Sequence, residues 1–287
     1  MLSVAFGVFA ALSWSVHDLF ARRMALRVGP FRMAALVMIA GAILLTAFVL
    51  THGTLWTASA TGVLQSLALG LAYGIGAGGL FKAFSLGPIS LVGPVTAAYP
   101  VLVVLWGVTN GLQPSGLQWL AVAATLAGAI IVARSGPADG GIDAVTPSKL
   151  PVLLFFCAVA SLGYATSVIL GQTAALSVGE VEAAWLSRPT ALLTILPFMA
   201  REPRAPRLTG RHWFGIAAMG ALDVLGLIAV NASGHLPGKE FAAVGISAYG
   251  AIAVILAMLV LKEKVSAGQW AGIALIVAGV ATLAVPQ

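Results

Sequence analysis

Charged residues are scarce in this chain: Asp, Glu, Lys and Arg make up only 8% of its 287 residues, against about 25% in soluble domains. Cysteine is scarcer still. The single Cys157 lies in an apolar run, which excludes a disulfide framework and a cysteine-based metal site. The chain has no Walker motif, GxSxG elbow or HExxH motif, and its four histidines are scattered. These absences predict a protein that is not an enzyme and that holds no cofactor or metal.

Apolar residues predominate instead. They make up 60% of the chain, and the mean hydropathy is +1.03. A water-soluble fold of this length cannot hide so much apolar surface, so the solvent is expected to be lipid. The apolar runs are long and continuous, without the ten-residue alternation of a membrane β-barrel. Since backbone amides in lipid must be paired within their own segment, we expect an all-α integral membrane protein.

A bilayer span needs about 20 mainly apolar residues. By this criterion the sequence predicts ten transmembrane helices, at 3–20, 31–51, 62–84, 88–110, 116–134, 151–171, 180–199, 212–233, 240–261 and 267–285.

The second half of the chain repeats the first. Residues 87–134 align without a gap to residues 238–285, and the specific part is Ser-x-x-Gln-Trp, at 115–119 and again at 266–270. We therefore expect two five-helix repeats, at 1–134 and 151–287, joined by the polar segment 135–150. Five is odd, so the second repeat is expected to be inverted. Inverted repeats are typical of transporters whose substrate site lies near the midplane.

Basic residues lie on one side of the expected spans. Loops after odd-numbered spans contain 13 of the 15 Lys and Arg residues, which places these loops in the cytoplasm and both termini outside. This distribution explains the pI of 9.9 as membrane orientation and gives no reason to expect nucleic acid as a partner. We expect a multi-pass protein of a bacterial inner membrane, as a monomer or weak homodimer.

The repeat resembles the EamA-type domain of the drug/metabolite transporter superfamily. The matching positions are Gly87-Pro88, Val92, Pro94, Pro100-Val101, Gln118 and Gly128, then Leu261-x-Glu263, Gln269, Gly272-Ile273, Leu275-Ile276 and Gly279-Val280. The resemblance covers nearly the whole chain and implies a ten-helix secondary transporter or facilitator. It further implies a central cavity between two four-helix halves, with the fifth and tenth helices peripheral. Where the family has Glu after the fourth span this chain has Leu112, and the family's termini are usually cytoplasmic.

Asp223 and Arg188 stand well inside expected spans, where a charge costs about 2.5–3.5 kcal/mol on insertion scales. Asp223 lies at the middle of the eighth span. It either binds a substrate ammonium or coupling proton, or serves as the structural partner of Arg188 in the seventh. Arg188 resembles an arginine of many EamA-type domains with a structural role, although its planar fork also suits a carboxylate or phosphate.

The end of the first span offers a second polar group. Trp14 and His17 are candidates to face the cavity, as the resemblance implies for the Trp of the first helix. Asp18 is expected to pair with Arg22 at i,i+4. Among the buried aromatic residues Tyr73, Tyr99, Tyr164, Trp185 and Tyr249, the first three are the candidates to line the cavity.

The predicted substrate-binding residues are therefore Asp223, His17, Trp14, Tyr73, Tyr99, Tyr164 and Arg188. The predicted function is transport of a small polar or amphipathic metabolite by alternating access. One central carboxylate with aromatic rings favours an amino acid or related organic amine. An intramembrane enzyme acting on a lipid-like substrate and an exporter of anionic or phosphorylated metabolites remain as alternatives.

Overall fold

The computed structural model describes residues 2–52, 58–111, 113–135, 145–203, 207–236, 238–262 and 264–283. Every regular element in these ranges is helical, and none of the residues described forms a strand. Leu112 and Glu263, at which the two halves differ in the family pattern, lie outside the described residues, as do residues 136–144 of the expected connecting segment. The expectation of an all-helical chain is confirmed for the part described.

The first half contains α1 (Leu2–Val28), α2 (Pro30–His52), α3 (Ala60–Leu86), α4 (Ile89–Thr96), α5 (Pro100–Thr109) and α6 (Gly116–Ser135). The second half contains α7 (Leu150–Val178), α8 (Glu180–Met199), α9 (Gly210–Ala232), the short helix η2 (Ser233–His235), α10 (Glu240–Ile246), α11 (Ala248–Leu256), the π-helical turn η3 (Ala257–Leu261) and α12 (Ala267–Leu283). Five of the described helices, α1, α2, α3, α7 and α9, are long and apolar enough to cross a bilayer.

The fourth segment of each half is broken near its middle. Three turn residues separate α4 from α5, and Pro100 opens α5 at a position where its missing N–H costs no helical hydrogen bond. In the second half Ser247 separates α10 from α11. Ser247 is equivalent under the repeat to Thr96, the last residue of α4, so the two breaks fall at neighbouring positions of the repeat.

The Ser-x-x-Gln-Trp motif is a helix start in both halves. The backbone N–H of Ser115 donates to the Gln118 side chain at 2.8 Å, and the Gln118 N–H donates back to the Ser115 hydroxyl at 3.3 Å. The same reciprocal pair joins Ser266 and Gln269, at 3.0 and 3.2 Å. Each box satisfies two amides that the first helical turn leaves unpaired, which explains why this part of the repeat is so similar.

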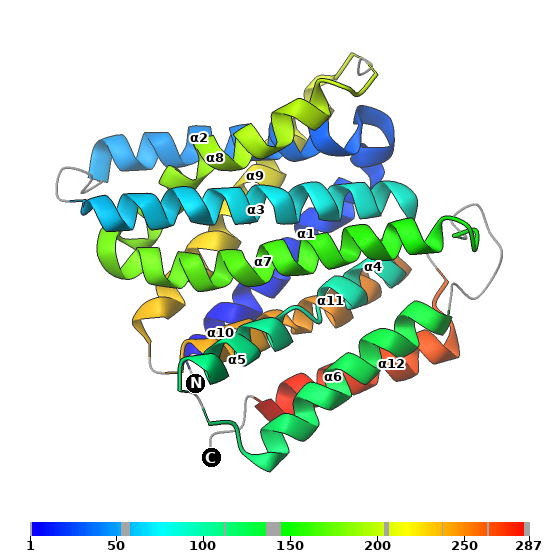
Figure 1. The fold of residues 1–287 in the computed structure, drawn as a ribbon. Helices are drawn as coiled ribbons and strands as arrows, with labels where there is room; N and C mark the ends of the chain where they lie inside the picture. The colour runs from blue at the N-terminus through cyan, green and yellow to red at the C-terminus, as the bar shows by residue number, and fades with distance from the viewer. Residues whose placement is uncertain are drawn as a thin grey trace.

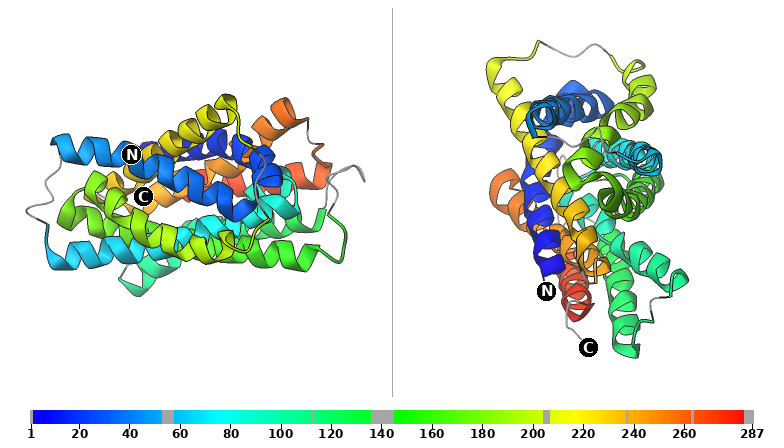
Figure 2. Two further views of the ribbon diagram at one scale, coloured as in Figure 1. Left: turned by 90° about the horizontal axis from the view of Figure 1, so that it is seen from above. Right: turned by 90° about the vertical axis from the view of Figure 1, so that its left-hand side faces the viewer.

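Equivalent helices pack against each other in antiparallel pairs. A Cβ atom on Gly128 of α6 would lie 2.6 Å from the carbonyl oxygen of Gly272 in α12. A Cβ on Gly279 of α12 would lie equally close to the carbonyl of Ala121 in α6. The two contacts are equivalent, because each is related to the other by the internal repeat. They hold α6 and α12 side by side at one edge of the bundle (Figures 1 and 2).

A second reciprocal pair lies at the centre. Gly76 of α3 faces the ring of Tyr164 in α7, and Gly226 of α9 faces the indole of Trp14 in α1. Gly76 and Gly226 stand 150 positions apart in the sequence, and so do Trp14 and Tyr164. The aromatic side chain of one repeat therefore rests on a glycine of the other, on both sides of the junction.

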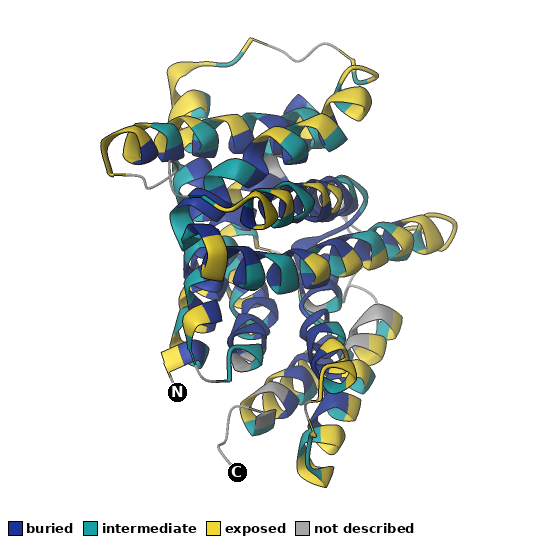
Figure 3. Ribbon diagram, turned by 60° about the vertical axis from the view of Figure 1, so that its left-hand side comes forward, coloured by how far each residue is buried: buried dark blue, intermediate teal, exposed yellow. Residues whose placement is uncertain are grey.

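The surface is apolar where a soluble protein would be polar. Exposed residues cover the outward sides of the helices around a buried interior (Figure 3). Large apolar side chains such as Leu50, Leu64 and Phe214 are at least two-thirds exposed. Soluble monomers seldom expose contiguous apolar patches of this kind, so the outward faces suit a lipid environment.

Candidate functional site

A cavity lies where the two halves meet, with an empty volume of about 600 Å³ including its open mouth. Both repeats line it, through α1 to α4 and the turn before α5 in the first half and through α7, α9, α10 and α11 in the second. Its polar and aromatic lining consists of Trp14, His17, Asp18, Tyr73, Phe81, Thr96, Tyr99, Tyr164, Asp223 and Tyr249.

Six of the seven residues predicted to bind substrate line this one cavity: Trp14, His17, Tyr73, Tyr99, Tyr164 and Asp223. Arg188 lies directly behind the lining, where it is almost fully buried in α8. The structure thus brings together residues that are up to 209 positions apart in the chain.

Asp223 is held by two partners from different helices. Its Oδ2 accepts from Nη1 of Arg188 at 2.8 Å, and its Oδ1 accepts from the hydroxyl of Tyr73. The Arg188 guanidinium also lies over the Tyr73 ring, 5.5 Å from its centroid, in the range of a cation–π contact. Tyr73 and Asp223 are equivalent positions of the two repeats, so this cluster joins the halves across their junction. The charge of Asp223 is matched by a permanent cation.

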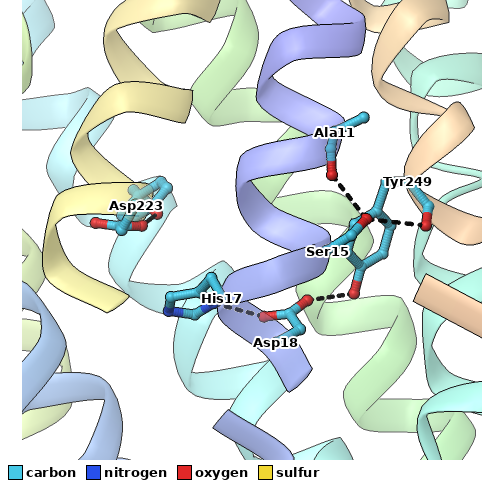
Figure 4. Close-up of polar contacts among 7 residues, drawn as sticks. Ala11, Ser15, His17, Asp18, Asp223 and Tyr249 are labelled. Atoms are coloured by element: carbon cyan, nitrogen blue, oxygen red, sulfur yellow. Dashed lines mark hydrogen bonds and ion pairs between the residues drawn. The ribbon is translucent and has the colours of Figure 1, made fainter. Parts of the chain in front are cut away.

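Asp18 forms a separate cluster on the facing side of the cavity (Figure 4). Its Oδ1 lies 2.7 Å from Nδ1 of His17, and its Oδ2 accepts from the hydroxyl of Tyr249. Ser15 supports the cluster, because its hydroxyl lies 2.7 Å from the Ala11 carbonyl and 3.3 Å from that of Tyr249. The expected partner Arg22 instead donates to the Phe84 carbonyl at 2.8 Å. The expected Asp18–Arg22 pair is therefore replaced by contacts to His17 and Tyr249.

Two buried nitrogen atoms of α1 have no hydrogen-bond partner among the residues described: Nε1 of Trp14 and Nε2 of His17. The two residues are three positions apart, on one face of the helix, and both line the cavity. The indole N–H can only donate, whereas Nε2 of a neutral imidazole accepts and that of an imidazolium donates. This edge of α1 is available to bind a polar group in the cavity.

Aromatic rings line the cavity between the two polar clusters. Tyr164 lies 5.7 Å from the ring of Tyr73 and 6.1 Å from that of Tyr99, measured between centroids. Phe81 meets the imidazole of His17 edge-on at 5.8 Å. Aromatic faces attract a cation in a desolvated site, so the lining suits a solute that carries an ammonium group. No group of three or more His, Cys, Asp or Glu side chains among the described residues is arranged to hold a metal ion.

Sequence reasoning missed Phe81 and Thr96 of the lining and two residues of the second polar cluster, Asp18 and Tyr249. The signal for Asp18 was available, because it lies one turn after Trp14 on α1, but the nearby Arg22 offered a simpler partner. Tyr249 needed the fold, since it stands 231 positions from the carboxylate to which it donates.

These features define a class: an all-helical, multi-pass membrane protein built from two repeats, with a polar and aromatic cavity between them. The chain belongs to the EamA-like transporter family of the drug/metabolite transporter superfamily, whose sequence profile matches residues 1–134 and 151–285. A solved crystal structure has the same fold, with a TM-score of 0.73 and 21% sequence identity over 98% of this chain and 95% of the other. The search of curated proteins found no match.

Proposed function

We propose that this protein is a secondary transporter or facilitator that moves a small polar or amphipathic metabolite across the membrane by alternating access. The observation that carries the proposal is the cavity at the junction of two antiparallel repeats, lined by both halves. In inverted-repeat transporters the substrate site lies at this junction, and rocking of the halves exposes it to each side in turn.

The substrate class we favour is an amino acid or related organic amine. Two carboxylates line the cavity together with four tyrosine rings and one indole, an environment that attracts an ammonium group. We assign contact with the solute to the six predicted residues of the lining and to Asp18, which lines the same cavity. Arg188 is given a positioning role, because its Nη1 holds the Asp223 carboxylate.

The membrane topology we propose has ten segments, two of them broken. The breaks after Thr96 and at Ser247 line or adjoin the cavity and supply points where the halves can bend, since short interruptions absorb the dihedral changes of domain motion. The proposed orientation has both termini outside a bacterial inner membrane. In support, the loops rich in Lys and Arg lie at the end of the bundle opposite to the start of α1 and the end of α12 (Figure 1).

Counterflow in proteoliposomes tests the proposal. Vesicles preloaded with pooled unlabelled amino acids are expected to take up labelled amino acids saturably. The Asp18→Asn variant is expected to lower this exchange about tenfold or more, the equivalent of ~1.4 kcal/mol, because it removes a carboxylate that faces the cavity. Glu240→Gln, at the start of α10 and outside the cavity lining, serves as the matched control. Absence of exchange for every amino acid in the pool would overturn the proposed substrate class.

A further inference from the structure

The two cavity carboxylates have unequal partners. Asp223 has the guanidinium of Arg188 at 2.8 Å, which remains protonated at any physiological pH. Asp18 contacts His17 and the hydroxyl of Tyr249. Of these two partners only the imidazole can carry a positive charge, and it does so only when protonated. The charge of Asp223 is thus matched permanently and that of Asp18 conditionally.

Burial makes this difference consequential. Asp18 is 2% exposed and His17 is 4% exposed, and an unpaired charge in such a site is costly. The hydroxyl of Tyr249 and an Nδ1–H of His17 both donate to Asp18. A cation beside Asp18 would offset this cost, and the cavity itself offers two sources: the imidazolium of His17 or the ammonium group of a solute.

We propose that a solute ammonium and the proton of His17 substitute for each other at Asp18, so that the transporter exchanges one proton for each cationic group it carries. When the ammonium binds against Asp18, the imidazolium loses the proton on Nε2 to water at the cavity mouth and keeps Nδ1–H on the carboxylate. The net charge of the cluster is then the same before and after binding. This inference rests on the proposed transport function and adds its energy source.

The groups around His17 agree with this assignment. Nε2 has no partner among the described residues and belongs to a cavity-lining side chain, so its proton has a path to the solute site. His17 is the one histidine among the residues that line the cavity. Among the described residues, the titratable and charged groups around it include Asp18 and Arg22 on α1, Tyr73 on α3, Tyr99 before α5, Tyr164 on α7, Arg188 on α8, Asp223 on α9 and Tyr249 on α11.

A pH gradient across proteoliposomes tests the exchange. The lumen is made one pH unit more acidic than the outside, potassium and valinomycin hold the membrane potential at zero, and the labelled probe is the pooled amino acids. Exchange of one proton per solute predicts that the solute accumulates about tenfold per pH unit, since one unit is a tenfold ratio of proton concentrations. In His17→Gln, whose amide can still donate to Asp18, the accumulation ratio is expected to fall to about one. His52→Gln, an exposed histidine at the end of α2, is the matched control and should accumulate like the parent.

Counterflow without a gradient, measured on the same vesicles, separates the possible failures. Counterflow with no effect of the gradient on the parent overturns proton exchange and leaves the transport function standing. Absence of counterflow in the parent overturns both the transport function and proton exchange. If His17→Gln does not fold, the ¹⁵N signals of His17 in the parent protein decide. When the amino-acid pool is added, these signals are expected to change from those of a doubly protonated ring to those of a ring that carries only Nδ1–H. Signals that do not change would overturn the proposal.

Discussion

Replacing Arg188 by Met is expected to destabilise the protein by ~3–5 kcal/mol, because it leaves the Asp223 carboxylate buried without its cation. Both side chains are at most 5% exposed, and their atoms are 2.8 Å apart. Adding Asp223→Asn to the same chain should recover most of the loss, since the amide keeps a partner in Tyr73 and carries no charge. Thermal unfolding in detergent, followed by circular dichroism, measures both variants.

The matched control is Arg201→Met, because Arg201 is exposed in the loop after α8. Removal of an exposed charge should change stability by less than about 1 kcal/mol. A double variant that is as unstable as the two single losses combined would show that Asp223 and Arg188 contribute independently. The ion pair between α8 and α9 would then add nothing to stability beyond the separate effects of its two side chains.

Replacing Gly226 by Ala is expected to lower transport about tenfold or more, equivalent to ~1.4 kcal/mol at the bound or transition state. The added Cβ would lie 2.6 Å from Nε1 of Trp14 and 2.7 Å from its Cε2. The rigid indole cannot yield by a simple rotation of its end, so the whole ring is pushed toward the cavity that it lines. Initial rates of amino-acid counterflow, normalised to reconstituted protein, measure the effect.

Gly78→Ala provides the control within another cavity helix. Its Cβ would meet the Phe31 ring at 3.6 Å, an ordinary van der Waals distance, and it should transport like the parent. Equal rates for Gly226→Ala and the parent would mean that the position of Trp14 has no influence on the solute. The α1 edge formed by Trp14 and His17 would then not be part of the binding site.

The architecture was predictable because it depends on local and periodic features. Composition fixes the lipid environment, and the recurrence of Ser-x-x-Gln-Trp fixes the duplication, which the structure explains as two equivalent capping boxes. The count of spans was harder to obtain. The fourth and ninth segments are continuous in hydropathy but broken in the backbone, since a three-residue turn and Ser247 interrupt them without adding charge.

Partners within the cavity were not predictable from spacing along the chain. The sequence left open whether Asp223 binds Arg188, and only the packing of α8 against α9 and α3 shows that it does. For Asp18 the expected partner Arg22 was wrong. Its hydroxyl donor Tyr249 comes from α11, which is distant in the sequence but packs against α1. Contacts between helices thus decide the chemistry of the cavity, whereas the sequence shows chiefly the contacts within a helix.

Accessibility of one cavity position from the two sides of the membrane tests the central claim most directly. Ala77 of α3 lines the cavity and is 3% exposed, so Ala77→Cys in a Cys157→Ala background places a single thiol there. Alternating access predicts that a membrane-impermeant thiol reagent labels this cysteine in right-side-out vesicles and also in inverted vesicles, and that the amino-acid pool slows both reactions. Gly116→Cys, at the start of α6 with open space around it, should react from one side only. Labelling of Ala77→Cys from one side alone, with no effect of the pool, would contradict the account.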